Sequence, residues 1–301
     1  ASGELTGCFA LTEENAGSEA TTLSTTARQD GDGWVIDGTK RFITNAPIAG
    51  LFTVLARTDP ETSGARGISA FLVEAGTPGL SAGTAYRKMG QAGSPVSDVL
   101  LDGCRVPAGA LLGEQEGEGF RTAMKVLNKQ RLHLAALCIG PAIRMLDDAV
   151  AHVTRRVQFG RPVAEHQLVQ AMIADCRTEI AAARALVLET ARKRDDGGDT
   201  RLEASMCKYF ASEMCGRGAD RAVQIFGGEA RQGAGRAVGI LIVESDHLGL
   251  DHLGAACLVE FADAIEDLFH EFAARAGEGK AEAIAALAGQ RHRQRQVRRP
   301  I

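Results

Sequence analysis

Small polar side chains follow a short apolar run close to the start of the chain. Residues 9–20 read FALTEENAGSEA, so that Thr12 precedes two acids and Asn15, and a small-residue stretch ends at Ser18. Small residues let a ligand approach the backbone, and hydroxyl groups both donate and accept hydrogen bonds. The segment is therefore a candidate ligand-binding turn, and an ordinary surface turn closed by the Ser18 hydroxyl is the alternative.

Two segments later in the chain suit a small anionic ligand. Arg156, within RRVQFG, carries a planar guanidinium whose forked donors bind a diphosphate in a way that lysine does not. Gly227 and Gly228 follow AVQIF and would let backbone N–H groups approach a phosphate. The alternatives are a surface arginine and a helix that simply ends at glycine.

The composition is that of a soluble globular protein. The 301 residues are 45% hydrophobic and 24% charged, which suffices for one large or two ordinary domains. The net charge of -4 argues against a nucleic-acid-binding body, because neutralising phosphates needs an excess of lysine and arginine. The basic tail at residues 291–299 is interpreted as a solvated chain end, with nucleic-acid binding as the alternative.

Neither a disulfide framework nor a metal site is indicated. The seven cysteines are an odd number without a CxxC pair, which predicts reduced thiols in a cytoplasmic protein. No run approaches the roughly 18 apolar residues that a membrane span needs, and the first residues carry no basic-then-apolar signal. We therefore expect a cytoplasmic protein with no metal and no membrane partner.

Residues 1 to about 105 are predicted to form an antiparallel β domain, a barrel or sandwich. Short β-branched or aromatic runs are cut by glycine, proline and aspartate every ten residues or so. The stretch DGDGWVIDGTKRFIT predicts a hairpin whose Asp-Gly turns flank alternating side chains around Trp34 and Ile36. A glycine- and glutamate-rich stretch, residues 109–119, is the expected linker.

A helical period replaces the strand pattern from Gly117 onward. We expect helices at about 120–156, interrupted near Gly140 and Pro141, and at about 201–226. Between them, a second helix is predicted to bury the stripe Leu168, Met172, Cys176, Ile180, Ala183 and Val187. The third helix is predicted to turn inward Met206, Phe210, Met214 and Val223.

The chain is therefore predicted to have an α+β fold in three parts. A β domain at residues 1–112 precedes a helical bundle at residues 113–228. Residues 229–301 form the third part, a segment with one amphipathic helix and the basic tail.

Four motifs, in this order and architecture, resemble those of the acyl-CoA dehydrogenase family of flavoproteins. Residues 12–18 stand where the family has a TE-PGAGS-type turn, and residues 42–45 (FITN) stand where it has W-I-(T/S)-N. The R-x-x-F-G element is at residues 156–160, and the Q-I-x-G-G helix end is at residues 224–228. The resemblance covers roughly residues 1–228 and implies a flavin-binding β domain followed by a helical bundle.

The resemblance implies FAD as the cofactor. Phe42 replaces the family's tryptophan as a wall of the flavin ring, and Thr44 bonds at N5. A buried ring also needs hydrogen-bond partners along its polar edge, since its nitrogen and oxygen atoms would otherwise be unpaired. The residues that the resemblance assigns to the ring are Phe9, Leu11, Thr12, Phe42, Ile43 and Thr44.

The same resemblance assigns the FAD diphosphate to Arg156 and the adenine side to Phe159. It also implies a dimer or tetramer, because in the family the helix end receives the ADP part of a neighbouring subunit's FAD. The residues matching that helix end are Gln224, Gly227 and Gly228. The residues matching positions near acyl-CoA are Ser18, Asn128 and Arg131.

The catalytic base is the residue that the resemblance does not supply. Removing the α-proton of a thioester needs a carboxylate, but the amide Gln130 stands at one family position of that glutamate. At the other position no Y-E-G-T-type segment is found; Asp251 has about the right spacing, and an ordinary loop acid is the alternative. The family's N-terminal helical domain is not found either, so a fragment or a chain with a replaced last segment is expected.

The leading hypothesis is an FAD-dependent acyl-CoA dehydrogenase that forms a trans-2-enoyl-CoA and passes electrons to an acceptor of the electron-transfer flavoprotein type. An oxidase that uses oxygen is a close variant. A catalytically silent helical module for self-association or for holding a partner is the alternative from another class, and Gln130 favours it. Acyl chain length and branching are not indicated by the sequence.

Overall fold

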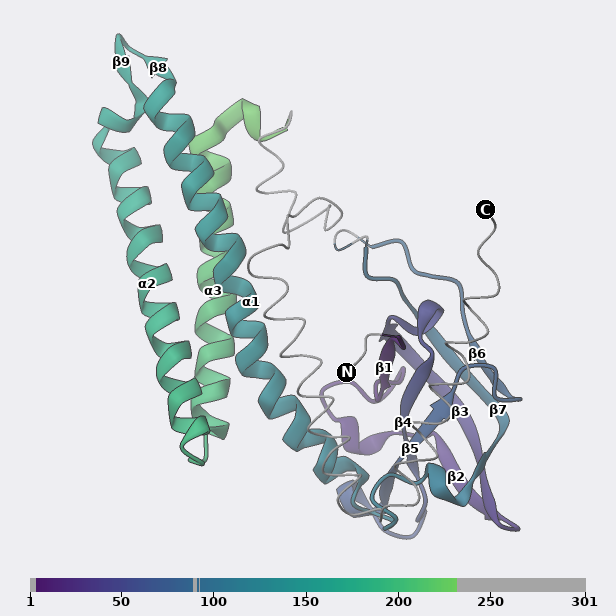
Figure 1. Cartoon of the computed structure of the whole chain (residues 1–301). Helices are drawn as coiled ribbons and strands as arrows, with labels where there is room; N and C mark the ends of the chain where they lie inside the picture. The colour runs from purple at the N-terminus through teal and green to yellow at the C-terminus, as the bar shows by residue number, and fades with distance from the viewer. Residues whose placement is uncertain (1–3, 89–90, 92, 232–301) are drawn as a thin grey trace, which may run out of the picture. The chain divides into compact units, whose positions relative to one another are not determined.

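The computed structural model describes residues 4–88, 91 and 93–231, which form two compact units (Figure 1). The β unit comprises residues 4–84 and 96–122. The helical unit comprises the described residues of 85–95 together with 123–231. The expected amphipathic helix and basic tail lie outside the described residues, and the domain boundaries at residues 112 and 228 stay predictions.

The β unit contains a seven-stranded sheet of order β1-β4-β2-β3-β7-β6, with β5 paired to β4. Its strands are β1 (Gly7–Ala10), β2 (Thr26–Asp30), β3 (Gly33–Thr44), β4 (Leu51–Arg57), β5 (Ile68–Glu74), β6 (Leu80–Ala82) and β7 (Val96–Pro107). Most neighbours are antiparallel, but β4 runs parallel to β1 and β2. The short 3₁₀ helices of this unit are η1 (Ala20–Thr22), η2 (Ala46–Ile48), η3 (Gly64–Gly67) and η4 (Ala108–Ala110).

The predicted hairpin joins β2 and β3. Asp30 pairs with Gly33, and Gly31 in the turn between them has a φ of 65°, which glycine adopts readily. The Asp-Gly pair at Asp37 and Gly38 is not a turn, contrary to expectation. Gly38 lies inside β3 at a register shift, where an added Cβ would lie 2.4 Å from Thr25 Oγ1. Close packing, and not chain reversal, therefore requires glycine at that position.

Side chains from several strands build the core of the β unit. Trp34, Ile36, Val54 and Phe71 are at most 5% exposed. The ring of Trp34 meets that of Phe71 edge-on, with centroids 5.3 Å apart. Burial of these large apolar side chains is the main force that holds the sheet together. The sheet therefore gives firm support to the strand ends that carry the candidate site.

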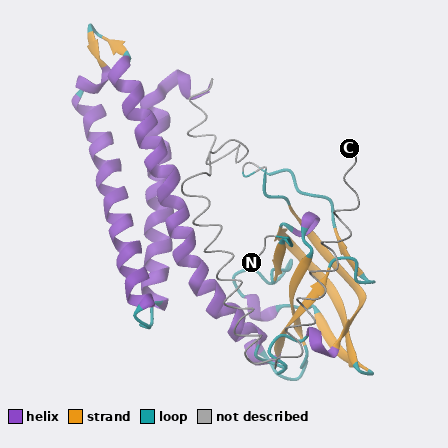
Figure 2. Cartoon of the chain, viewed as in Figure 1, coloured by secondary structure: helices purple, strands orange, loops and turns teal. Residues whose placement is uncertain are grey.

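The helical unit is built from three long helices (Figure 2). They are α1 (Gly119–Arg155, of which residues 119–122 belong to the β unit), α2 (Gln167–Asp195) and α3 (Arg201–Phe226). The hairpin β8 (Val157–Gln158) and β9 (Arg161–Pro162) and the turn η5 (Val163–Glu165) connect α1 to α2, and η6 (Gly227–Arg231) follows α3. The α+β fold class is thereby confirmed.

The predicted interruption of the first helix is wrong. The helix α1 continues through Pro141, because a proline removes only one N–H from the helical ladder. Its neighbours Ile139 and Ala142 are buried in the core of the helical unit. Packing of these flanking residues therefore outweighs the local cost of the proline.

The second helix buries most of its predicted stripe. Cys176, Ile180, Ala183 and Val187 are buried in α2, and Met172 packs against the same core. Leu168 departs from the prediction, since it is 81% exposed in the first turn of the helix. The 3.6-residue period thus holds from the second turn onward.

The third helix differs more from its predicted inner face. Met214 is buried and Phe210 partly buried, but Met206 and Val223 are 47% and 41% exposed. The buried face consists largely of small residues, which are Ala204, Cys207, Ala211, Cys215 and Ala222. The distance between packed helices depends on the side chains at the contact, so small residues allow a close approach. Residue size, which the apolar period ignores, decided the face.

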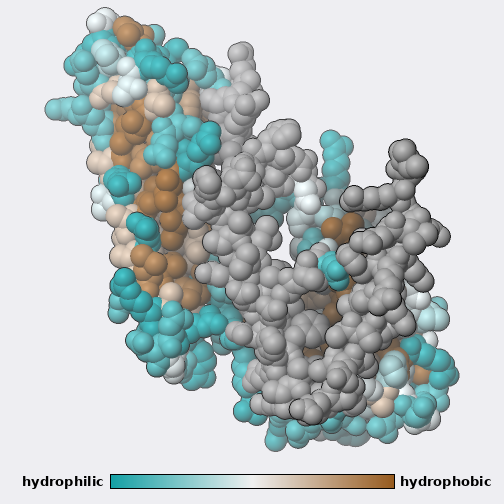
Figure 3. Space-filling model, in the orientation of Figure 1, coloured by the Kyte–Doolittle hydropathy of each residue, from teal (hydrophilic) through white to brown (hydrophobic). Residues whose placement is uncertain are grey.

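Hydrophobic side chains form a strip along the visible face of the helical unit (Figure 3). Residues of all three helices also line a narrow apolar cleft, among them Met145, Ile180 and Met214. None of the helices in the described part of the chain is both long and apolar enough to cross a membrane. Six of the seven cysteines lie in the described residues, and all six are free thiols.

Replacing Phe71 by alanine should destabilise the β unit by about 3 to 5 kcal/mol, because the mutation leaves a cavity in a close-packed core. Trp34 is the single tryptophan of the chain and contacts Phe71, so its fluorescence during urea unfolding reports on this unit. Leu100→Ala is the control, since Leu100 is 48% exposed in the same sheet. Equal losses in the two variants would contradict the packing described here.

Candidate functional site

Two chain segments assigned to a ligand by the sequence meet in the β unit. Residues 9–12 continue from β1, and residues 42–44 end β3. The N–H of Arg41 donates a hydrogen bond of 2.8 Å to the carbonyl of Thr12. The segments therefore lie side by side, which sequence distance alone would not require.

The end of β3 presents its residues in an irregular way. The register with β7 shifts between Lys40 and Ile43, so the strand bulges there. Phe42, within the bulge, has a φ of 56° and is 61% exposed, while Ile43 is buried. A positive φ is costly for a bulky side chain and is typical of functional sites. The strained bulge turns an aromatic ring outward at the place where a ring-binding wall is expected.

The remaining predicted residues of this group differ in exposure. Phe9 and Thr12 are half-buried and Leu11 is buried, whereas Thr44 is exposed. Ser18 is also exposed, in a bend after the turn at residues 13–16. Backbone groups and side chains at this edge can thus offer both apolar surface and hydrogen-bond partners to a ligand.

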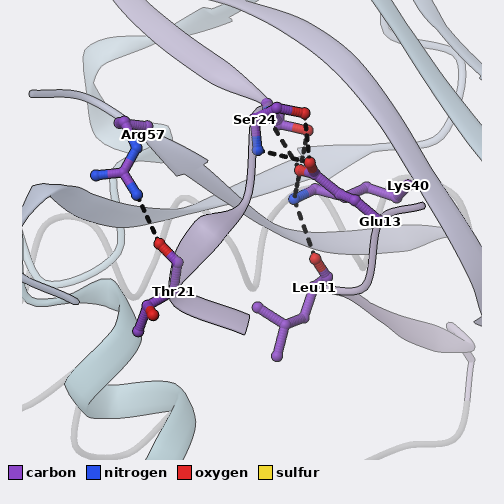
Figure 4. A network of polar contacts seen from close by, with 7 residues as sticks. Leu11, Glu13, Thr21, Ser24, Lys40 and Arg57 are labelled. Carbon is purple, nitrogen blue, oxygen red and sulfur yellow. Dashed lines mark hydrogen bonds and ion pairs between the residues drawn. The ribbon is translucent and has the colours of Figure 1, made fainter. Parts of the chain in front are cut away.

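A buried ion pair lies directly behind the two segments (Figure 4). The ammonium of Lys40, which is completely buried, lies 2.8 Å from Glu13 Oε1, and it donates a 3.2 Å hydrogen bond to the Leu11 carbonyl. Glu13 also accepts hydrogen bonds from the N–H and hydroxyl groups of Ser24 and Thr25, at 2.5 to 3.0 Å. Both buried charges therefore have close partners, as burial requires.

Burial acts on the two partners in opposite directions. It raises the pKa of the Glu13 carboxyl, but the charge of Lys40 and hydrogen bonds from Lys40, Ser24 and Thr25 outweigh it and bring the pKa to about 2. Burial lowers the pKa of Lys40 to about 8, against the opposing attraction of Glu13. The pair is therefore a carboxylate and an ammonium at neutral pH.

The ion pair was not predicted from the sequence, although the alternation of side chains along β3 indicated a buried Lys40. Trp34, Ile36, Gly38 and Lys40 alternate along β3 with the period of two that places side chains on one face. Continuing that period predicts an inward Lys40, which then needs an anion. The identity of the anion, Glu13, depends on a contact 27 residues away and could not be found from the pattern.

In the helical unit, Arg156 and the glycine pair come together. Arg156 follows α1, and its guanidinium lies 2.9 Å from the carboxylate of Glu229, the residue after Gly227 and Gly228. The same carboxylate lies 3.5 Å from His152. Arg156 is nevertheless almost half exposed, so its donors remain accessible to an anion.

The end of α3 stops at a glycine, but not in the usual left-handed helical conformation. Gly227 has a φ of 58° and a ψ of −130°, and its N–H donates to the Val223 carbonyl, which caps the helix. Gly228 and Gln224 are exposed. A capping role does not exclude a phosphate, because the exposed glycines leave the backbone open to close approach.

The hairpin between α1 and α2 exposes an aromatic ring. Phe159 has a φ of 53° and Gly160 one of 77°, the pair of positive angles that a two-residue hairpin turn needs. Phe159 is 94% exposed and meets the ring of His166 at 6.1 Å. A strained, exposed phenylalanine suits contact with a planar ligand group.

Two of the three residues matched to acyl-CoA, Asn128 and Arg131, lie on α1 in the helical unit. Arg131 donates a 2.5 Å hydrogen bond to the side chain of Asn128, so the two predicted residues form one polar group. Gln130 lies beside them on the helix, half-buried. Ser18, the third predicted contact, belongs to the β unit, and Asp251 lies outside the described residues. In the described part of the chain, no cluster of residues could hold a metal ion.

The described fold is a β unit followed by a helical bundle, with motif residues at the ends of β1 and β3 and around the end of α3. Two family models match these two parts. The acyl-CoA dehydrogenase middle domain matches residues 8–104, and the acyl-CoA dehydrogenase C-terminal domain matches residues 117–243. The chain belongs to the acyl-CoA dehydrogenase family.

Individual relatives support the same family. The chain is 43% identical over 228 residues to an acyl-CoA dehydrogenase of Bacillus subtilis, a match that covers 76% of this chain and 60% of that one. It is 43% identical over 220 residues to the caffeyl-CoA reductase-Etf complex subunit CarC of Acetobacterium woodii, covering 73% and 58%. A solved structure of PigA with FAD and proline is 32% identical, with a TM-score of 0.74, covering 78% and 61%. The chain thus spans about three fifths of the length of these relatives.

Replacing Glu13 by glutamine should lower the free energy of unfolding at pH 7 by about 3 kcal/mol, because Lys40 would remain buried without an anion. Urea unfolding followed by Trp34 fluorescence measures the change. Asp30→Asn is the matched control, since Asp30 pairs with Arg105 in the same sheet but near the surface, and it should cost about 1 kcal/mol or less. A loss in the Glu13 variant no larger than in the control would contradict the described pair.

Proposed function

We propose that this protein is an FAD-dependent acyl-CoA dehydrogenase, which oxidises an acyl-CoA thioester to the trans-2-enoyl-CoA. The observation that carries the proposal is the hydrogen bond from the Arg41 N–H to the Thr12 carbonyl, which joins the Thr12 segment to the bulge that exposes Phe42. The family resemblance places the flavin ring at this edge. The relatives include enzymes named dehydrogenases and enzymes named reductases, which run the same bond change in opposite directions.

The residues of the β unit fit the ring of FAD. Phe9, Leu11 and Phe42 offer apolar surface, and Thr12 and Thr44 offer hydroxyl groups at the same edge. A flavin needs this combination, since its faces are apolar and its edge carries nitrogen and oxygen atoms. When bound, FAD accepts the hydride that leaves the β-carbon of the substrate. The protein's part is to hold the ring and exclude water from it.

The residues of the helical unit fit the other half of the cofactor. Arg156 offers forked donors to a diphosphate, Phe159 offers a flat surface to adenine, and the exposed glycines admit a close backbone approach. By resemblance, Gln224, Gly227 and Gly228 receive the FAD of a neighbouring copy, so we propose a homodimer or homotetramer. Asn128, Arg131 and Ser18 are proposed to contact acyl-CoA.

The relatives also suggest a setting for the enzyme. One of them is named as a subunit of a caffeyl-CoA reductase-Etf complex. A structure solved in work on the electron transferring flavoprotein of Acidaminococcus fermentans contains a chain that is 40% identical to this one. We propose an electron-transfer flavoprotein as the acceptor, with a role in fatty acid metabolism in the cytoplasm. The catalytic base is not among the assigned residues: Gln130 is an amide, and Asp251 is the candidate that the sequence offers.

Arg156→Met should weaken FAD binding about 30-fold, because one charge-assisted hydrogen bond to a diphosphate contributes roughly 2 kcal/mol. Titrating the apoprotein with FAD and following flavin fluorescence gives the dissociation constant. Arg144→Met is the control, since Arg144 is also an exposed arginine of α1 and forms an ion pair with Asp148. A full chain that binds no FAD would overturn the proposed function.

A catalytically silent module is the second candidate, and the amide at Gln130 is the observation that favours it. Anaerobic mixing of the FAD-loaded chain with acyl-CoAs of several lengths separates the two. An active enzyme bleaches the flavin absorption band with at least one of them, since the ring is reduced. An unchanged band with every acyl-CoA would support the silent module.

A further inference from the structure

We propose that Lys40, anchored by Glu13, is a positioning residue for the ring-binding edge of the β unit. It would set the spacing between residues 11–13 and residues 41–44, the two segments that face the ligand. The inference rests on the proposed function, because the ligand in question is the flavin ring.

Lys40 and Arg41 together bind all three residues of the segment 11–13. The Lys40 ammonium reaches the Leu11 carbonyl at 3.2 Å and the Glu13 carboxylate at 2.8 Å, on either side of Thr12. The N–H of Arg41 donates a hydrogen bond of 2.8 Å to the Thr12 carbonyl. Three consecutive residues are thus tied to two consecutive residues of β3. Strand β1 ends at Ala10 and its ladder is to β4, so these bonds replace a β ladder.

Glu13, the partner of Lys40, is itself held by a third segment of the chain. Glu13 accepts four hydrogen bonds from Ser24 and Thr25, the residues that lead into β2. Its carboxylate therefore has little freedom to move when Lys40 pulls on it. In Figure 4, Ser24 and Leu11 lie on opposite sides of the Glu13 carboxylate. A fixed carboxylate makes Lys40 a rigid spacer and not a loose contact.

Lys40 lies at the start of the bulge in β3. Phe42 has a φ of 56°, which is costly for a bulky side chain and persists only where the surrounding structure holds it. Lys40 is fully buried on one flank, and Ile43 is 2% exposed on the other. The ion pair thus anchors the aromatic wall as well as the Thr12 segment.

Stability alone does not explain a buried ion pair. An apolar pair of similar volume is often equally stable, because removing two charges from water is expensive. A paired charge does require a particular arrangement of its partners. A positioning role therefore predicts that an uncharged replacement will fold and yet hold the two segments less well.

The test is the double variant Glu13→Gln with Lys40→Met, which removes both charges and nearly keeps the volume. Its circular dichroism should stay close to that of the parent, while its melting temperature should fall, because a glutamine amide has one accepting oxygen for the four donors of Ser24 and Thr25. FAD binding should weaken about tenfold, the loss equal to one hydrogen bond of about 1.4 kcal/mol. The bound flavin should also lose the fine structure of its absorption band, because the ring is held less rigidly. Asp30→Asn with Arg105→Met is the control pair and should change none of these.

Hydrogen exchange adds a measurement that does not depend on FAD. In the double variant the Arg41 amide should exchange about tenfold faster, while amides of the β4–β5 ladder keep their rates. A folded double variant with parental FAD affinity, flavin spectrum and Arg41 exchange would overturn the inference. A parent that binds no FAD would overturn the proposed function instead. Faster Arg41 exchange in the double variant than in the parent would then still support the spacing role.

If the double variant does not fold, Lys40→Met alone and Glu13→Gln alone are compared at a urea concentration where the parent is native. A soluble single variant with parental Arg41 exchange and parental FAD affinity then overturns the inference. Faster Arg41 exchange, with weaker FAD binding, supports it.

Discussion

The buried contact between Glu13 and Lys40 is the constraint on which the proposed ring-binding edge depends. A buried charge is tolerated only where every partner is in place, so this pair restricts how three segments of the β unit can be arranged. One segment continues β1, one leads into β2, and one is the end of β3. The exposed, strained Phe42 and the Thr12 carbonyl inherit their positions from this arrangement.

The helical unit solves a different physical problem. Small residues on the buried face of α3 let this helix approach α2 closely. Longer side chains such as Met206 lie partly exposed on its other side. Just after the end of α3, the carboxylate of Glu229 contacts the side chains of His152 and Arg156. An arginine paired with a half-exposed carboxylate can exchange that partner for a phosphate, because surface ion pairs contribute little.

The two units also differ in how they would serve a dinucleotide. The β unit offers apolar walls and neutral hydrogen-bond partners, which suit an aromatic ring, while the helical unit offers a cation and glycines, which suit a diphosphate. Each kind of group is found where the family motifs stand. The chain's membership of the acyl-CoA dehydrogenase family thus agrees with the chemistry of its own residues.

Much of this protein was determined by the sequence on its own, because periodicity and turn residues act locally. The hairpin at Asp30, the fold class and the three helices, apart from the break expected at Pro141, followed from patterns a few residues long. The tertiary structure decided what depends on distant partners: the parallel pairings of β4, the bulge at Phe42, the inner face of α3 and the anion that Lys40 meets. Those features arise because packing and buried charge are settled by residues that the chain brings together from far apart, which no local pattern records.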